Sequence, residues 1–303
     1  MNDFIELLKN QSVRFHLINE TSATEIMLHE YSYYTLMEYS VLFPAYNSSS
    51  KHGFVDLDFS DLYSLAILDE KLRYILVLSV LDIERIIKTA FVSDIYKVNA
   101  ENSILQEYMD MNADFISRYY SEESNDSISN QHHISDMYSW SLDQFINIVH
   151  FGTFVHLMRF FYSTYANAIY NKDYAPFERH LDSVRRLRNH VAHCNSLLSL
   201  LAEEGPTTTD AVASYLGKNG IKSRTLRTNF SKPIIRDFCH FLHLYFNIDS
   251  TFLHENFPKT LYEFLNIDCK KHSSRLKSNN ILLSSYNFVF QVLKIYYKSY
   301  NNS

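Results

Sequence analysis

Glycine and proline are scarce in this chain of 303 residues, which contains only five of each. Sandwiches and barrels of β-strands need many tight turns, and tight turns draw on these two residues. The scarcity argues against an all-β protein and favours long helices. Cysteine is also rare, with three widely separated residues: Cys194, Cys239 and Cys269. An odd number at such spacing indicates reduced thiols rather than a disulfide framework.

Positive charge and long apolar runs are lacking as well. The formal net charge is −6, so contact with a nucleic acid needs a local basic surface rather than the field of the whole protein. The N-terminal sequence MNDFIELLKNQ has neither the basic start nor the apolar stretch of a secretory signal. The most apolar run, residues 74–81, is too short to cross a bilayer. We expect a soluble, cytoplasmic protein with no membrane partner.

Aromatic residues are abundant, with 23 Tyr and 22 Phe, and they supply area for a hydrophobic core. Helical periodicity is strongest over residues 61–95, where leucine and isoleucine recur every three or four positions. Similar patterns predict further helices over residues 103–120, 140–169, 175–200, 233–246 and 281–297. We expect only Gly152 to interrupt the helix over 140–169.

Another helix is expected near the N-terminus, where Ser22 and Glu25 fit a capping box, and it should end near Pro44. Residues 11–18 and 54–59 resemble short extended pieces on either side of it. Farther along, residues 121–133 resemble an exposed loop and residues 203–232 a polar segment with basic side chains.

The sequence thus predicts an all-α fold with a minor short β element near the N-terminus. We expect residues 1–60 to form an N-terminal extension packed on a helical core over residues 61–200. A C-terminal helical region over residues 201–303 follows, and the whole chain is expected to be one continuous globular unit.

Residues 177–198 contain the side chains most suited to catalysis. An apolar stripe runs through Phe177, Leu181, Val184, Leu187, Val191, Cys194 and Leu198. At about 100° per residue, the opposite helix face carries Asp182, Arg186, Asn189 and His193. Arg185 and Arg188 lie to one side of the stripe. These polar groups are therefore expected to point away from the core. On that outer face, His193 is either a catalytic residue or an ordinary surface residue.

Arginine, asparagine and histidine together suit transfer chemistry within an RNA backbone. The histidine, His193, can take a proton from the ribose 2′-hydroxyl or give one to the leaving oxygen. Arg188 can bind the scissile phosphate and offset the charge that develops in the transition state, while Asn189 orients the imidazole or a phosphate oxygen. This chemistry needs no metal or cofactor. It needs the 2′-hydroxyl, so DNA should not be cut by this route.

The stretch Leu187–Asn195, LRNHVAHCN, resembles the Arg-Asn-x3-His motif of the HEPN ribonuclease superfamily. More narrowly, the chain resembles the Abi-like AbiD/AbiF group of bacterial abortive-infection proteins. Four further features resemble that group: the D-x-x-L-R run Asp69–Arg73 with Ile83–Glu84 after it, Trp140, the run Phe151–Thr153, and the tyrosine-containing run Tyr33–Met37. Together these features span roughly residues 12–200. The Arg-Leu pair that often follows the family's histidine is replaced here by Asn195–Leu197.

The resemblance implies a HEPN-like helical bundle, here with extra N-terminal and C-terminal helices. It also implies a homodimer in which the catalytic helix faces its copy, so that two sets of Arg188, Asn189 and His193 line one cleft. Defence against phage through RNA damage is implied as well, with a small non-coding RNA as an inhibitory partner in some relatives.

Several other residues have two interpretations. The residues Arg185, Arg186, His190, Lys218, Lys222, Arg224 and Arg227 are candidates for RNA binding, although the segment from 218 onward can equally be a flexible solvated loop. Arg73 and Glu84 either support the catalytic helix across a helix contact or are solvated charges. A zinc site would use His190, His193 and Cys194, or Cys239, His240 and His243, with Cys269 and His272 farther on, but neither cluster has paired C-x-x-C spacing.

From the sequence we therefore expect a metal-independent endoribonuclease toxin of an anti-phage abortive-infection system. The catalytic residues are expected to be Arg188, Asn189 and His193, with RNA as the substrate. The alternative is a non-catalytic HEPN-like module that binds a regulatory non-coding RNA or forms oligomers, because a fold alone does not determine function.

Overall fold

The computed structural model describes residues 2–46, 52–114, 139–165, 174–206, 210–248, 253, 256–272, 277 and 279–300. Contacts within the chain divide it into two compact units. The larger unit combines Met1–Asp82 with Arg186–Ser303, and the smaller one is Ile83–Arg185. This division does not test the boundaries expected near residues 60 and 200, which stay a prediction.

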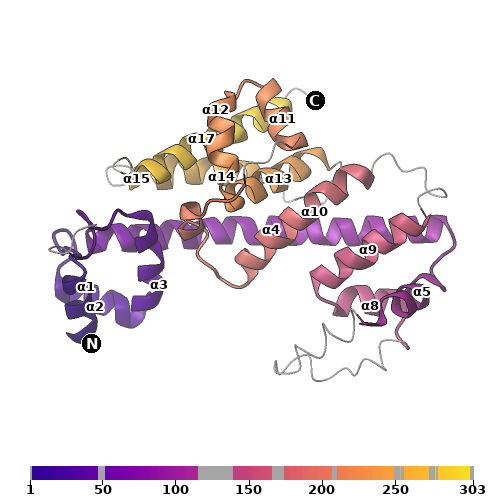
Figure 1. The fold of residues 1–303 in the computed structure, drawn as a ribbon, viewed down its shortest axis with the longest axis horizontal. Helices are drawn as coiled ribbons and strands as arrows, with labels where there is room; N and C mark the ends of the chain where they lie inside the picture. The colour runs from indigo at the N-terminus through magenta and orange to yellow at the C-terminus, as the bar shows by residue number, and fades with distance from the viewer. Residues whose placement is uncertain are drawn as a thin grey trace. The chain divides into compact units, whose positions relative to one another are not determined.

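Helices make up most of the described residues of the larger unit (Figure 1). In chain order they are α1 (Asn2–Asn10), α2 (Glu20–His29), α3 (Tyr33–Met37), the 3-10 helix η1 (Glu38–Leu42), the first part of α4 (Phe59–Lys97), the end of α10 (Tyr174–Ala192), the 3-10 helix η4 (Ser199–Ala202), α11 (Ala211–Lys218), α12 (Ser223–Phe230), α13 (Pro233–Asn247), α14 (Phe257–Glu263), the π-helical turn η5 (Phe264–Asp268), α15 (Cys269–Lys271) and α17 (Asn280–Tyr300).

The smaller unit is helical too. It contains the second part of α4, α5 (Ile104–Met111), α8 (Leu142–Ile148), α9 (Phe151–Tyr165) and the first part of α10. Its core is aromatic, because the buried ring of Phe91 makes edge contacts with Phe154 and Phe161 at centroid distances of 5.4 Å. Inside this core the hydroxyl of Tyr162 donates to the carboxylate of Asp94 at 2.6 Å.

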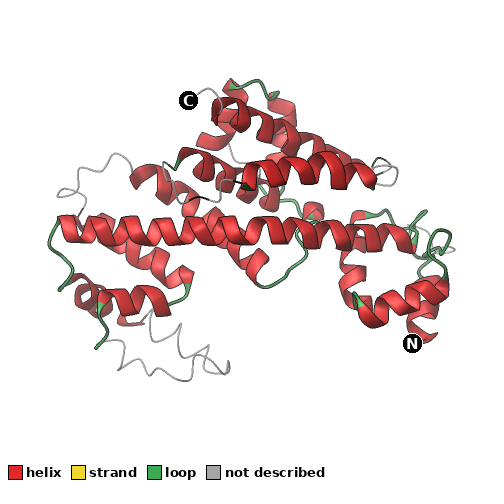
Figure 2. Cartoon of the chain, turned by 180° about the vertical axis from the view of Figure 1, so that it is seen from behind, coloured by secondary structure: helices red, strands yellow, loops and turns green. Residues whose placement is uncertain are grey.

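The all-α class is confirmed, since the described residues contain helices, loops and no sheet (Figure 2). Extended pairing near the N-terminus is limited to isolated bridges, Arg14 with Asp58 and Ala45 with Phe54. Arg14, Asp58 and Phe54 lie in the two extended pieces expected from the sequence, and Ala45 lies outside them. None of the described helices is both long enough and apolar enough to cross a bilayer.

Several helix ends differ from expectation, and the helix expected to end near Pro44 ends at His29. The predicted capping box of Ser22 and Glu25 is wrong, because α2 begins at Glu20 and its cap is Asn19, whose side chain accepts from the backbone N–H of Ser22 at 2.8 Å. The predicted break at Gly152 is wrong as well. Helix α8 ends at Ile148, and Gly152 lies in the first turn of α9, where a glycine costs a helix little.

The polar segment over residues 203–232 contains two helices, α11 and α12, which the sequence did not suggest. Each has only eight residues, so its few buried apolar side chains show no clear periodicity. Helix α5 ends at Met111, short of the expected residue 120. Residues 115–138, which include the expected loop at 121–133, lie outside the described residues, as do residues 166–173.

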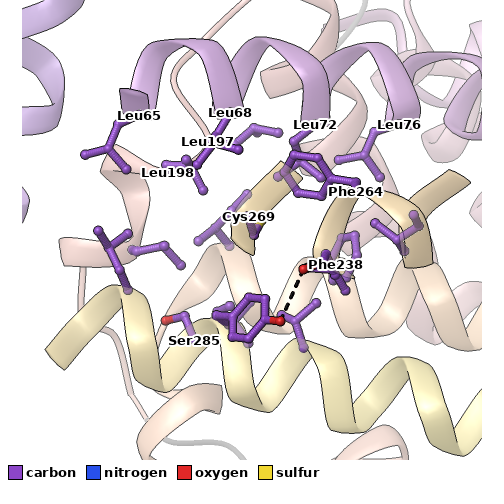
Figure 3. A pocket seen from close by; sticks show the side chains of 18 of the residues that line it. Leu65, Leu68, Leu72, Leu76, Leu197, Leu198, Phe238, Phe264, Cys269 and Ser285 are labelled. Atoms are coloured by element: carbon purple, nitrogen blue, oxygen red, sulfur yellow. Dashed lines mark hydrogen bonds between the residues drawn. The ribbon is translucent and has the colours of Figure 1, made fainter. Parts of the chain in front are cut away.

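An apolar core in the larger unit forms where α4 passes α13, α17 and the residues that follow α10. Leu65, Leu68, Leu72 and Leu76 line a cavity of about 120 Å³ from the side of α4. Figure 3 shows these four leucines with Leu197 and Leu198 on one side and Phe238 across from them. The catalytic candidates are therefore attached to an apolar core through Leu187, which also lines the cavity.

Replacing Leu68 by alanine is expected to lower the free energy of unfolding by about 2–5 kcal/mol, because Leu68 is 2% exposed and its loss enlarges an existing cavity. The matched control is Leu78→Ala on the same helix. Leu78 is 52% exposed, so its loss should change stability by no more than about 0.5 kcal/mol. Urea unfolding followed by circular dichroism measures both, and equal effects would contradict this description of the core.

Candidate active site

Helix α10 carries Arg188 and Asn189 near its C-terminal end, and His193 follows directly after its last residue, Ala192. Leu181, Val184, Leu187 and Val191 are buried along one side, as the apolar stripe predicts. The expected continuation to residue 200 is wrong, because α10 ends at Ala192 and a short turn leads into η4. Cys194 was placed in the apolar stripe, but it is exposed because it lies beyond the end of the helix.

The helix end is closed by a Schellman motif, in which two backbone N–H groups beyond the helix donate back into its last turn. Cys194 N–H donates to the carbonyl of Val191 at 3.3 Å, and Asn195 N–H donates to the carbonyl of His190 at 3.0 Å. This motif needs a left-handed residue, and Cys194 occupies that position with φ of 55°. Glycine is the usual residue there, since a side chain strains the left-handed conformation.

Arg188, Asn189 and His193 lie together at this end. Arg188 and Asn189 are half-buried, and His193 is exposed. The backbone N–H of His193 donates to the carbonyl of Asn189 at 3.0 Å, which places the histidine one turn beyond the asparagine. A guanidinium Nη1 of Arg188 lies 3.5 Å from the side-chain oxygen of Asn189. The imidazole is therefore accessible from solvent and close in the chain to a guanidinium and an amide.

The turn after His193 is held by a pair of residues on α4. One nitrogen of Arg73 donates to the carboxylate of Asp69 at 2.7 Å and to the carbonyls of Cys194 and Asn195 at 3.2 Å each. The other carboxylate oxygen of Asp69 accepts from the backbone N–H of Leu198 at 2.6 Å. The Asp69–Arg73 clamp thus binds both carbonyls and an N–H of the segment that follows the candidate histidine.

Asp69 of this clamp is fully buried. Burial raises the pKa of its carboxyl group to about 6, and the Leu198 N–H and the Arg73 guanidinium counteract part of that rise. The hydroxyl of the buried Tyr39 also hydrogen-bonds with Asp69, and it hydrogen-bonds with Ser196 in the turn. The turn is therefore tied to buried groups on α4 and η1.

The other candidates near the site have partners of their own. Arg186 forms a two-point ion pair with the buried Asp237 of α13, with N–O distances of 2.8 and 2.6 Å. This pair gives Arg186 a structural role in attaching α10 to α13. His190 Nδ1 lies 3.4 Å from the amide nitrogen of Asn195, within the same turn as the Schellman motif. In the smaller unit, Arg185 lies 3.8 Å from Asp182.

The remaining predicted residues are distributed elsewhere. Glu84 belongs to the smaller unit and pairs with Lys88 on its own helix at 2.9 Å, whereas Arg73 contacts the segment that follows α10. The basic residues Lys218, Lys222, Arg224 and Arg227 are exposed on α11, α12 and the turn that joins them. The expectation that they bind RNA stays a prediction.

Among the residues that the structure describes, no three His, Cys, Asp or Glu side chains lie close enough together to hold a metal ion. Cys239 is fully buried, and burial raises the pKa of its thiol well above the ordinary value. Its neighbour His240 instead pairs with Asp210, with Nε2 and Oδ2 at 2.9 Å.

A family model described as Abi-like protein matches residues 26–199. That match covers more than half of the chain, from α2 through the Asp69–Arg73 clamp to the turn after His193. The chain belongs to the Abi-like protein family. No curated protein and no solved structure matches it in comparison. Within this Abi-like chain, the motif Asp69–Arg73 and the motif around Arg188 and His193 meet at one place in the structure.

Sequence reasoning missed two members of this arrangement, Tyr39 and Ser196. Nothing in the sequence distinguishes a buried tyrosine from the many others. Asp69 carried a clearer signal, because it is a carboxylate inside the leucine-rich stripe of α4, between Leu68 and Leu72. A charge at such a position requires buried partners.

The buried Asp69 predicts a pH dependence of stability. Its folded-state pKa of about 6 lies above the ordinary 3.8, so the unfolded chain releases this proton first as the pH rises. The unfolding free energy of wild type minus that of Asp69→Asn should therefore fall between pH 4 and pH 7, by at most about 3 kcal/mol. Unfolding by urea across that range measures it. A constant difference, or one that grows with pH, would contradict the assignment.

The strained cap predicts a stabilising substitution. Cys194→Gly should raise the free energy of unfolding by about 1 kcal/mol, because glycine adopts φ of 55° without a clash. Cys194→Ala is the control, since alanine keeps the Cβ atom and should give no such gain. Urea unfolding under reducing conditions compares the three proteins. Equal stability of the glycine and alanine variants would show that the left-handed turn does not form.

Proposed function

We propose that this Abi-like protein is a metal-independent endoribonuclease whose reacting groups are Arg188, Asn189 and His193. The observation that carries the proposal is the exposed imidazole of His193, placed one turn beyond Arg188 and Asn189. The Asp69–Arg73 clamp, whose carboxylate is fully buried, holds the backbone immediately after that imidazole.

The reaction is attack of a ribose 2′-oxygen on the adjacent phosphorus. The 2′-hydroxyl gives up its proton, the bond from phosphorus to the 5′-oxygen breaks, and that oxygen takes up a proton. The products are a 2′,3′-cyclic phosphate and a 5′-hydroxyl end. His193 serves one of the two proton transfers, as general base or general acid. The reaction consumes no water and requires no metal at this step.

Arg188 is proposed to counteract the negative charge at the C-terminal end of α10, where the site lies. The C-terminal end of a helix carries a partial negative charge, which disfavours a phosphate there. The guanidinium of Arg188 offsets this charge and stabilises the charge that builds on the phosphate oxygens. Asn189 orients the imidazole or a phosphate oxygen.

A homodimer would complete the chemistry. One His193 performs one proton transfer, and the second transfer needs another group at the same phosphate. A copy of α10 across a twofold axis would bring a second His193 and a second Arg188 to the same cleft. In the cell, we propose that this activity damages RNA during phage infection as the toxin of an abortive-infection system, with a small non-coding RNA as its inhibitor.

Cleavage of a single-stranded RNA by the purified full chain in excess EDTA tests the proposal. His193→Ala should lower the rate by about 10²–10⁴-fold, and Arg188→Ala by about 10²–10³-fold. His29→Ala, which changes a histidine that is exposed on α2, is the control and should keep the wild-type rate. DNA of the same sequence should stay intact, and the RNA products should carry cyclic phosphate ends.

Unchanged cleavage by His193→Ala would overturn the proposal. RNA binding without cleavage by wild type and variant alike would also overturn it, and would favour the non-catalytic RNA-binding module instead.

A further inference from the structure

Helices α11 and α12 form a compact pair in which the second helix exposes a basic face. The pair is joined by four residues, Asn219–Lys222, and Gly220 in this turn has φ of 100°. Ile221 N–H donates to the carbonyl of Leu216 at 3.1 Å, and Gly220 N–H donates to the carbonyl of Gly217 at 3.2 Å. These bonds end α11 with a Schellman motif, and α12 begins at once. Two helices joined by a short glycine-containing turn are typical of a helix-turn-helix.

Buried side chains hold this pair on the rest of the larger unit. Val212, Ala213 and Leu216 of α11 are buried, as is Phe230 of α12. The ring of Phe230 meets Phe288 of α17 edge-on at 6.1 Å. Contacts join α12 to α11, α13 and α17, and the four helices lie together in Figure 1. The exposed face of α12 is therefore presented by a packed scaffold.

The exposed face carries positive charge only. Arg224 and Arg227 are exposed and lie about 60° apart around the helix, on one face, and Thr228 is exposed beside them. Lys218 and Lys222 are exposed at the turn. Within the described residues these four basic side chains have no ion-pair partner, and residues 211–236 contain no acidic residue.

The nearest carboxylates in the chain do not neutralise this face. Asp210 caps α11 by accepting from the N–H of Ala213 at 2.8 Å and also pairs with His240. Asp237 is buried and pairs with Arg186. In a chain with a net charge of −6, a basic face whose neighbouring acids are engaged elsewhere is a surface for an anionic partner.

We propose that α12 docks into the major groove of duplex DNA, with Arg224 and Arg227 facing the DNA and Lys218 and Lys222 at its phosphates. The major groove of B-DNA is about 12 Å wide and admits one helix, and the second helix of a helix-turn-helix occupies it. This site does not depend on the ribonuclease activity proposed for Arg188 and His193.

Two features separate duplex DNA from RNA as the partner. Single-stranded RNA is bound by stacking its bases on aromatic side chains, and the one aromatic residue of α12, Phe230, is buried. Duplex RNA has a deep and narrow major groove that a helix does not enter. The arginines expected from the sequence to bind RNA are thus better placed for duplex DNA.

Fluorescence anisotropy with a labelled 25-base-pair duplex DNA of mixed sequence tests this site. The full chain carries His193→Ala, so that RNA probes stay intact for comparison. We expect duplex DNA to bind more tightly than duplex RNA or single-stranded RNA of the same sequence. Arg224→Ala with Arg227→Ala should weaken DNA binding at least tenfold and reduce the salt dependence by about two in log–log slope.

The matched control replaces two exposed lysines of the same unit, Lys259→Ala and Lys270→Ala, which make an equal change in charge on α14 and α15. The control should change the affinity by less than threefold. Circular dichroism of both double variants checks that they stay folded. The site would be refuted by equal losses in the two double variants, by absent binding of duplex DNA at low salt, or by tighter binding of either RNA. Loss of RNA cleavage by His193→Ala is measured separately, so each proposal can fail alone.

Discussion

A carboxylate buried from solvent sets the end of helix α10. Asp69 accepts from the N–H of Leu198 and from Arg73, and Arg73 donates to the carbonyls of Cys194 and Asn195. An ionised group in an apolar interior is costly unless nearly all its hydrogen bonds are made. Because those bonds come from the turn after His193, the buried charge and the position of that turn stabilise each other. Burial raises the pKa of Asp69 because the ionised carboxylate loses hydration free energy in the apolar interior.

This constraint links the two sequence motifs in space. In the run Asp69–Arg73, the fully buried Asp69 and the partly buried Arg73 hold the backbone next to the exposed His193. The catalytic role proposed for His193 and Arg188 needs groups held in place before the RNA arrives. The ion pair of Arg186 with Asp237 fixes the same helix from α13. The end of α10 is thus attached on two sides, while its polar groups stay accessible.

The sequence predicted the long helices well, whereas the catalytic role of the site residues stays a prediction. Helices α4, α13 and α17 follow the expected ranges closely, because many apolar residues at helical spacing give a strong signal. The predicted end of α10 was wrong because its left-handed cap residue is Cys194. Glycine is the usual residue at that position and would have indicated the end of the helix. Helices α11 and α12 were missed because each buries few residues, and their stability comes from packing against α13 and α17. The partners Tyr39 and Ser196 depend on contacts between distant segments, which no local pattern records.

The central claim is that the Asp69–Arg73 clamp fixes the backbone after His193. Hydrogen exchange of the backbone amides measures this directly, above all at Leu198, whose N–H donates to Asp69. In Arg73→Gln and Asp69→Asn we expect exchange in residues 194–198 to become much faster than in wild type, with α17 unchanged under the same conditions. Wild-type protection of the Leu198 amide in both variants would contradict the claim, because the turn would then hold its position without the clamp.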